Sequence, residues 1–200
     1  MRAFLDDGVW ENIRHQFVVM LREGAKREAS PTAAIVDTQS VKTTESGGPR
    51  GWDAAKRLKG RKRHVAVDAD GLLLGILVHA ADIQDADGLG DLLKRVKPLY
   101  NWLRVVFADS IYNRLAALLA CFAFGLALII VRRPASSTGF IVQPRRWVVE
   151  RSFGWFGRWR RLSKDYETLP EVSEAMITLA AIRLMLHRLA HPNPRRLPAS

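Results

Sequence analysis

The feature that most constrains the fold is an apolar run of seventeen residues, Leu115–Val131, which has arginines on both sides. A run of this length is just short of a membrane-spanning helix, which needs about 20 apolar residues. Its composition changes along its length: residues 115–124 are rich in alanine and leucine, Gly125 follows, and residues 126–131 are rich in isoleucine and valine. This change favours a helix, a glycine cap and a buried strand, and therefore no membrane segment. A membrane protein built on the whole run is the alternative.

The composition is typical of one globular domain with a partner of opposite charge. The chain has 200 residues, of which 48% are hydrophobic and 26% charged, so it can bury a core of its own. Its net charge of +11 favours nucleic acid as the partner, because basic side chains release counterions from phosphates; a ribosomal or membrane-surface protein could carry the same charge. The single cysteine, Cys121, excludes an intrachain disulfide, and a cytoplasmic location is expected.

The remaining periodicity predicts alternating strands and helices, and hence the α/β class. The expected elements are a helix at 9–25, a strand at 33–41, a hairpin at 64–80, a helix ending near residue 100, a strand at 103–109, a helix reaching about residue 164 and a last helix at 170–189. Asp68 and Asp70 belong to the turn of the hairpin and are better interpreted as turn residues than as metal ligands.

Positive charge is concentrated in two parts of the chain. Residues 42–63 contain eight Lys/Arg, four glycines and two acids, and residues 65–93 contain no Lys or Arg. The cluster Lys59–His64 at the end of the first part is predicted to be a phosphate-contacting loop, with an ordinary solvated loop as the alternative. The second part, residues 132–164, holds nine Lys/Arg and a single acid, Glu150.

The helix that contains Glu150 allows two interpretations of this residue. In isolation, a lone glutamate among basic residues is most simply an ion-pair partner on a helix face. Trp155, Trp159 and Leu162 stand at i, i+4 and i+7 and form an apolar stripe that is expected to lie mostly in the core. Arg146 and Arg161 share the opposite helix face with Glu150, where the glutamate could instead be a working group.

Three carboxylates together favour the functional interpretation. Asp37 lies in the first expected strand, Asp109 ends the strand at 103–109, and Glu150 lies on a later helix. Carboxylates brought together repel one another, and a divalent cation removes that cost. Oxygen ligands suit Mg²⁺ or Mn²⁺, and two such ions can activate an attacking oxygen and stabilise a leaving one in a phosphodiester substrate.

Several separated motifs occur in an order that resembles a known family. The chain is similar to the catalytic part of a bacterial insertion-sequence transposase of the DDE type, nearest to insertion sequence family five. The resemblance covers about residues 10–190, and its motifs are Ile35–Thr44, Gly60–His64, His79–Asp85, Phe107–Asp109, Pro144–Arg151, Arg160–Leu162 and Lys164–Glu167. It implies a ribonuclease-H-like mixed five-stranded sheet flanked by helices. The expected organisation is an N-terminal helix and linker at 1–30, a catalytic domain at 31–190 and a disordered tail at 191–200.

The resemblance also implies a role for each carboxylate. Asp37, Asp109 and Glu150 match the three catalytic and metal-binding residues, which would hold two Mg²⁺ or Mn²⁺ ions. The implied reaction is hydrolysis at the transposon ends, followed by attack of the freed 3′-hydroxyl on target DNA. The implied partners are DNA ends and target DNA, with a homodimer or larger assembly on the DNA. Charge and resemblance together predict the DNA-binding residues Lys42, Lys59, Arg61, Lys62, Arg63, Arg145, Arg146, Arg151, Arg158 and Arg161.

The sequence also departs from the pattern of this family. Gln143 stands where relatives often have tyrosine, Gly157 where they often have lysine, and Ser110–Ile111 where they usually have glycines. Relatives usually carry a further N-terminal helical region that recognises the ends, and this chain has no room for one. We therefore expect a truncated frame, or half of a protein joined by frameshifting to an upstream region. The same pattern is compatible with an inactive DNA-binding remnant of such a transposase and with a generic ribonuclease-H-like nuclease.

Overall fold

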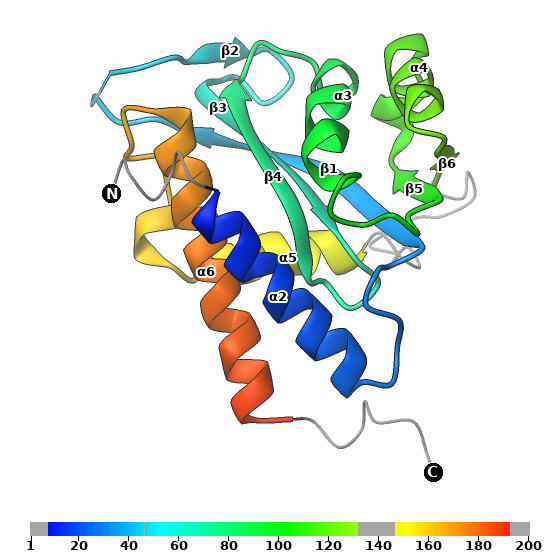
Figure 1. Ribbon diagram of the computed structural model, residues 1–200. Coiled ribbons are helices and arrows are strands. Elements are labelled where there is room, and N and C mark those ends of the chain that lie inside the picture. The colour runs from blue at the N-terminus through cyan, green and yellow to red at the C-terminus, as the bar shows by residue number, and fades with distance from the viewer. Residues whose placement is uncertain (1–7, 46, 132–146, 193–200) are drawn as a thin grey trace, which may run out of the picture.

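The computed structural model describes residues 8–45, 47–131 and 147–192, and its centre is a mixed sheet (Figure 1). Strand β3 (Leu58–Val67) pairs antiparallel with β1 (Ala33–Lys42) on one side and with β2 (Gly51–Asp53) and β4 (Leu73–Ala80) on the other. On the far side of β1, strand β5 (Val105–Ala108) and then β6 (Ala127–Ile130) add in parallel. This is the predicted ribonuclease-H-like mixed sheet, with the short β2 as a sixth strand.

Helices cover both faces of this sheet. Helix α3 (Asp85–Val96) packs on β3 and β4, and α4 (Leu115–Ala123) lies beside α3. Helix α5 (Trp147–Gly157) packs against β1 and β3, while α2 (Val9–Gly24) and α6 (Pro170–Ala190) pack against each other and against β4 (Figure 1). Two 3-10 turns complete the described chain, η1 (Ser110–Tyr112) after β5 and η2 (Arg160–Leu162) after α5.

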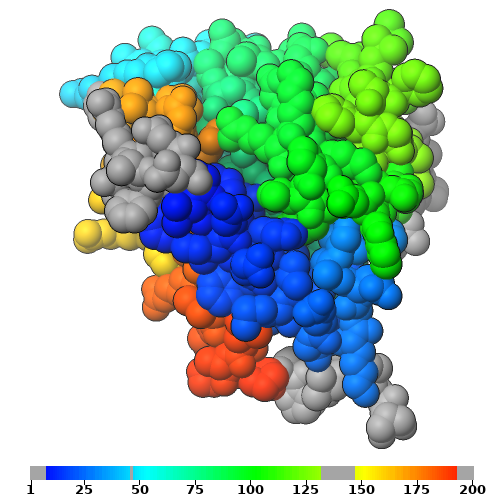
Figure 2. Space-filling view, viewed as in Figure 1, coloured from blue at the N-terminus to red at the C-terminus, as the bar shows by residue number. Residues whose placement is uncertain are grey.

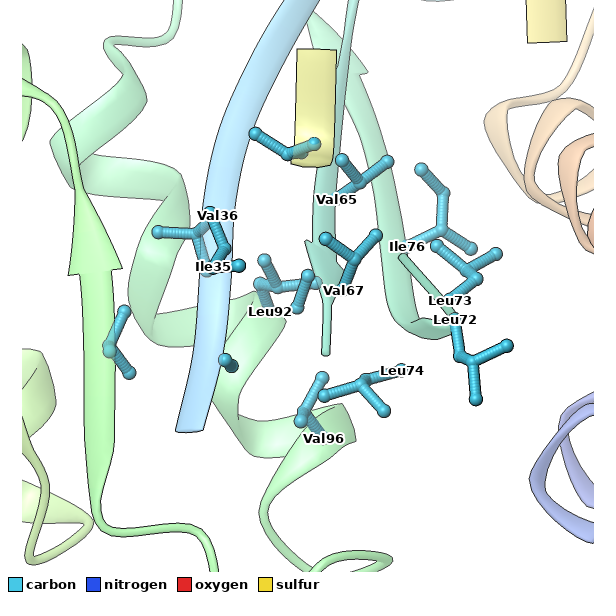
Figure 3. Close-up of a cluster of buried hydrophobic side chains, with 14 of the residues drawn as sticks. Ile35, Val36, Val65, Val67, Leu72, Leu73, Leu74, Ile76, Leu92 and Val96 are labelled. Atoms are coloured by element: carbon cyan, nitrogen blue, oxygen red, sulfur yellow. The ribbon is translucent and has the colours of Figure 1, made fainter. Parts of the chain in front are cut away.

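The core forms where the sheet meets α3. Alternating side chains of β1, β3 and β4 interlock with the apolar stripe of α3, which Leu92 and Val96 contribute to (Figure 3). Strands β1 and β3 are buried on both faces over much of their length, which explains the continuous apolar stretches Ile35–Val36 and Val65–Val67. The buried centre of β1 and β3 therefore provides a rigid base for residues further along both strands.

The apolar run Leu115–Val131 divides as its composition predicts. Helix α4 ends at Ala123, Gly125 adopts a left-handed conformation with φ 65°, and β6 begins at Ala127. Glycine adopts such a positive φ without steric cost, so the chain can reverse here from helix to strand. Within the described residues, no helix combines the length and apolar character needed to cross a bilayer.

Two predicted boundaries are wrong. The hairpin begins at Leu58 and not at His64, because the basic segment Lys59–His64 is part of β3. Helix α5 ends at Gly157 and does not reach Lys164, as expected where glycine weakens a helix, and η2 follows it. The predicted tail at 191–200 lies outside the described residues from position 193 onward.

Candidate active site

Strand register brings Asp37 and Asp109 to neighbouring positions. Parallel pairing between β1 and β5 aligns Ile35 with Phe107, and each aspartate lies two residues further along its own strand direction. Neighbouring strands are about 4.8 Å apart, and residues two apart on a strand point to the same face. Asp37 and Asp109 are therefore level with each other, at the point where β5 ends beside β1.

Backbone amides orient both carboxylates. The Thr38 N–H donates to Asp37 Oδ1 at 2.8 Å, and the Ile111 N–H donates to Asp109 Oδ1 at 2.9 Å. Asp109 thereby caps η1, so the turn that follows β5 fixes its side chain. Both aspartates are partly exposed, which leaves oxygen atoms at the surface where a substrate could approach.

Helix α5, which carries Glu150, packs on the face of the sheet to which Asp37 belongs. Gln39 shares the face of Asp37 and accepts a long 3.5 Å hydrogen bond from Arg63, whose guanidinium also donates to the Leu162 carbonyl beyond α5. In its first turn the helix buries Val148 and Val149 and exposes Glu150. Asp37 of β1 and Asp109, which follows β5, therefore share one face of the sheet, and α5 packs on that face. That Glu150 joins the two aspartates stays a prediction.

The three carboxylates are not drawn together into a closed cage. Among the described residues, no group of three or more His, Cys, Asp or Glu side chains is arranged to hold a metal ion. The donor chemistry fits Mg²⁺ or Mn²⁺, since carboxylate oxygens are the ligands these ions take, and Asp37 and Asp109 are placed as a pair. Like charges oppose bringing three carboxylates together unless a cation offsets them, and Glu150 as the third ligand stays a prediction.

A buried polar network on the opposite face braces the two aspartates. Thr38, next to Asp37, donates to Asp85 Oδ2 at 2.6 Å, and Lys62 Nζ lies 2.8 Å from Asp85 Oδ1. A 2.7 Å hydrogen bond joins the hydroxyl of Tyr112, which ends η1, to His64 Nε2 on β3. The residues that follow each aspartate are thus tied to β3 and α3.

Electrostatics keep this network in one protonation state. Burial, and secondly the neighbouring His79, lower the pKa of His64 to about 3, so its imidazole is neutral at pH 7. Burial alone would raise the pKa of Asp85, but the hydrogen bonds from Lys62 and Thr38 outweigh it and lower the pKa. This network could not be predicted from the sequence, because its members are dispersed along the chain and residues 59–64, polar apart from Gly60, show no alternation that would indicate a strand.

The prediction that Lys59–His64 forms a DNA-binding loop is wrong for three of its residues. Arg61, Lys62 and Arg63 are 0%, 9% and 1% exposed. Arg61 donates to the carbonyls of Thr168 at 2.6 Å and Glu167 at 2.8 Å. These cations are therefore structural, because a buried charge is tolerated only when it is paired and hydrogen-bonded.

The buried arginines connect β3 to the segment between α5 and α6. Arg61 Nη1 is 3.3 Å from Asp165 Oδ1, and both side chains are fully buried. Arg63 donates to the carbonyls of Leu162 at 2.7 Å and Lys164 at 3.0 Å. The backbone of Asp165 also donates to the Lys42 carbonyl at the end of β1. Arg61, Arg63 and Asp165 form what we call the arginine clamp, which holds the chain beyond α5 against β1 and β3.

The other predicted DNA-binding residues divide into two groups. Lys42, Lys59 and Arg158 are exposed, and Arg161 is exposed although its Nε donates to Glu167 at 2.9 Å. For these four, DNA binding stays a prediction. Arg145 and Arg146 lie outside the described residues.

The apolar stripe predicted to lie mostly in the core is only partly buried: Leu162 belongs to the core and Trp159 packs against it, whereas Trp155 is half-buried beside two arginines. Arg151 stacks between the rings of Trp147 and Trp155, at 4.3 and 4.7 Å, and Arg188 of α6 lies 4.7 Å from the Trp155 ring. Trp159 is also half-buried, and Arg183 stacks on it. The helix buries Val148, Val149, Ser152, Phe153 and Phe156 in their place. Arg151 is therefore held by two aromatic rings, and its part in DNA binding stays a prediction.

Comparison with known proteins identifies the family. Residues 28–185 match the family described as the transposase DDE domain, so the chain belongs to that family. A protein of Burkholderia cepacia assigned as a transposase for insertion sequence element IS402 is 29% identical over 139 residues, which are 66% of this chain and 64% of that protein. The chain thus spans less than two thirds of the length of this curated relative.

Two solved structures are also similar over 82% of this chain, each at 15% identity. One is a simian T-cell lymphotropic virus intasome in complex with the PP2A regulatory subunit B56 gamma, of which 50% is covered with a TM-score of 0.47. The other is the HTLV-2 integrase catalytic core domain in complex with magnesium, of which 88% is covered with a TM-score of 0.43.

Proposed function

We propose that this domain is the catalytic domain of a transposase of the insertion sequence family five type. It would cut DNA at transposon ends and join the freed ends to target DNA. The observation that carries the proposal is the register that sets Asp37 level with Asp109, on the face that α5 covers with Glu150. Family membership over residues 28–185, which include all three carboxylates, supports it.

The residues of this chain would divide the work as follows. Asp37, Asp109 and Glu150 would hold the metal. Mg²⁺ or Mn²⁺, two ions in the working complex, would supply Lewis acidity at the scissile phosphate. Exposed Lys42, Lys59 and Arg158 would contact the phosphate backbone of the DNA.

Two successive displacements at phosphorus follow from this arrangement. Water first attacks a phosphodiester at the transposon end, the P–O3′ bond breaks, and the released 3′-oxygen takes a proton. That 3′-hydroxyl then attacks a target phosphodiester: a new P–O3′ bond forms, the old one breaks, and no covalent enzyme intermediate arises. We place this activity in the cytoplasm, in a homodimer or larger assembly on DNA, with residues 31–190 as the catalytic domain.

The test is Mn²⁺-dependent nicking of plasmid DNA that carries candidate ends. We expect wild type to nick, and Asp109→Ala and Glu150→Gln to lose the activity. Asp91→Ala and Glu171→Gln change exposed carboxylates elsewhere and should nick as wild type does. Equal nicking by all five proteins would overturn the assignment. Metal binding without any cleavage would favour the inactive DNA-binding remnant, and nicking without joining to new DNA would favour a generic nuclease.

A further inference from the structure

The β2–β3 hairpin exposes a tryptophan among cations. Trp52 is 56% exposed, and the strand register sets it opposite Lys59. The tip of the hairpin adds Lys56 and Arg57, which are also exposed. The exposed side chains of residues 52–59 thus include one aromatic ring and three cations but no acid, because Asp53 is only 6% exposed. This cyan segment forms an outer corner of the molecule, where another molecule can reach it (Figures 1 and 2).

The backbone at the tip has a conformation that glycine would adopt more easily. Arg57 has φ 52°, which lies in the left-handed region that side chains rarely occupy. Asp53 fixes the turn, since its side chain accepts from the Lys56 N–H at 3.0 Å and from the Ser40 hydroxyl at 2.6 Å. Strain of this kind is concentrated at functional sites, and here it keeps a guanidinium where the backbone alone favours glycine.

Trp52 and Lys59 lie on the face of the sheet that carries Asp37. Val65 of β3 is directly opposite Asp37. Side chains two apart on a strand share a face, which places Lys59 on the face of Val65, and Trp52 is opposite Lys59. Lys59 precedes Val65 by six residues, so the hairpin presents its ring about 20 Å along the strand from the candidate active site, at about 3.3 Å per residue.

Two acids beside Trp52 lie on the other face of the sheet. Gly51 and Asp53 flank Trp52 and point away from its face, because side chains alternate along a strand. A Cβ built on Gly51 would lie 2.0 Å from Asp82 Oδ1, so Asp82 packs on that other face as well. These carboxylates therefore do not oppose a negatively charged partner on the face of Trp52.

The part of the chain between the candidate active site and the hairpin is also basic. The arginine clamp holds residues 162–168 over the intervening part of β3. Along the chain from the end of α5 to this segment, Arg158, Arg160 and Lys164 are exposed. A polyanion that leaves the carboxylates can therefore contact cations on its way to the hairpin.

We propose that the β2–β3 hairpin binds the DNA that flanks the cut, with Trp52 stacked on an unpaired base and the three exposed cations of the hairpin on its phosphates. The inference rests on the proposed function, which places the cut at the candidate active site. DNA rises about 3.4 Å per base pair, so about 20 Å corresponds to about six base pairs from the scissile phosphate. Every base has a face on which an indole ring can stack, so this contact favours unpaired DNA without reading its sequence.

The test is fluorescence anisotropy of a labelled single-stranded oligothymidine and of a labelled duplex of the same length, each with the full chain. Trp52→Ala should weaken binding of the oligothymidine about tenfold, because one stacked base contributes a factor of that order, and Trp52→Phe should keep most of the affinity. The duplex should lose less affinity, since its bases stack on one another. Trp102→Ala removes a ring of similar exposure, 49%, just before β5 and should bind as wild type does.

Arg57→Gly separates the role of the cation from that of the fold. It relieves the left-handed conformation, so the urea midpoint of unfolding should stay or rise, whereas the affinity for both DNAs should fall severalfold. Lys26→Gly is the matched control, because Lys26 is exposed and also has a positive φ, 55°, but follows α2. It should bind both DNAs within about twofold of wild type.

Three results would overturn the inference. The first is a Trp52→Ala chain that binds the oligothymidine as tightly as Trp102→Ala does. The second is equal DNA affinity of Arg57→Gly and Lys26→Gly. The third is binding of poly-L-glutamate as tight as that of the oligothymidine and equally sensitive to Trp52→Ala, which would assign the hairpin to an acidic protein.

Mn²⁺-dependent nicking of plasmid DNA tests the proposed function separately. Loss of nicking by Asp109→Ala, together with unchanged oligothymidine binding by Trp52→Ala, would contradict the inference alone. Unchanged nicking by Asp109→Ala, together with weaker binding by Trp52→Ala, would contradict the proposed function and leave the hairpin as a DNA contact.

Discussion

Strand β3 and the segment from α5 to η2 both carry several basic residues, but the side chains of the two regions have opposite environments. Arg61 and Arg63 of β3 are buried, and carbonyl oxygens surround their guanidinium groups. On α5 and just beyond it, Arg151 is half-exposed on two tryptophan rings and Arg158 is exposed. The comparison shows that a cluster of positive charge in a sequence does not by itself indicate a DNA-binding surface; the partners available to each cation decide its role.

The largest effect should come from breaking the arginine clamp. Arg61→Ala leaves Asp165 as a buried charge without its partner and leaves the Thr168 carbonyl without a donor. We expect the free energy of unfolding in urea to fall by about 3–5 kcal/mol, up to loss of folding. Lys59→Ala removes an exposed cation of the same strand and should cost no more than about 0.5 kcal/mol. Equal stability of the two variants, with weaker DNA binding by Arg61→Ala, would return Arg61 to the DNA-binding surface.

A smaller effect is expected from buried His64 of β3, which should make the free energy of unfolding depend on pH. His64 has a pKa of about 3 in the folded chain because it is buried and lies near His79, whereas an unfolded histidine has a pKa near 6.5. Between pH 6.5 and pH 3 only the unfolded chain binds the proton. The contribution of neutral His64 to the free energy of unfolding is therefore fully present above pH 6.5 and is lost as the pH falls towards 3. The slope is about 1.4 kcal/mol per pH unit below pH 6.

Unfolding free energies of wild type and His64→Gln at pH 7, 6 and 5 would measure this contribution. The wild type should lose more stability on acidification than the variant, whatever their difference at pH 7. Parallel pH profiles would mean that His64 is accessible to protons in the folded chain, contrary to its burial.

The smallest effect is expected for single exposed cations. Lys42→Ala and Arg158→Ala should each weaken DNA binding severalfold, and reduce the slope of log K against log salt by about 1. Their unfolding free energies should stay within about 0.5 kcal/mol of wild type, since both side chains are exposed. Fluorescence anisotropy at several salt concentrations measures the affinity and its salt slope, and urea unfolding measures the stability. An unchanged salt slope in both variants would place the DNA elsewhere.

Local patterns in the sequence predicted those parts of the fold that depend on local chemistry. The change of composition at Gly125 predicted α4 and β6, because a glycine at positive φ ends a helix wherever it occurs. The burial of Arg61 and Arg63 could not be predicted, because the carbonyls that accept from them, at Leu162–Thr168, lie about a hundred residues away along the chain. A helical spacing of four also does not say which face is buried, and so Trp155 and Trp159 were assigned to the core.

Part of the candidate site could be predicted from the sequence and part could not. Asp37 and Asp109 could be proposed from their places in two strands, and the β1–β5 register sets them level. The bracing contacts of Thr38 and Tyr112 could not, since each depends on a residue of α3 or β3 brought close only by the fold. Glu150 as the third carboxylate of the site stays a prediction.

The central claim is that Asp37, Asp109 and Glu150 share one metal site, and Mn²⁺ binding followed by electron paramagnetic resonance tests it most directly. Loss of an outer-shell partner already costs 10–100-fold in metal affinity, so Asp37→Asn, Asp109→Asn and Glu150→Gln should each weaken Mn²⁺ binding by about tenfold or more. Asp91→Asn, an exposed carboxylate paired with Lys94, should bind as wild type does. Equal Mn²⁺ affinity in all of these proteins would contradict the claim.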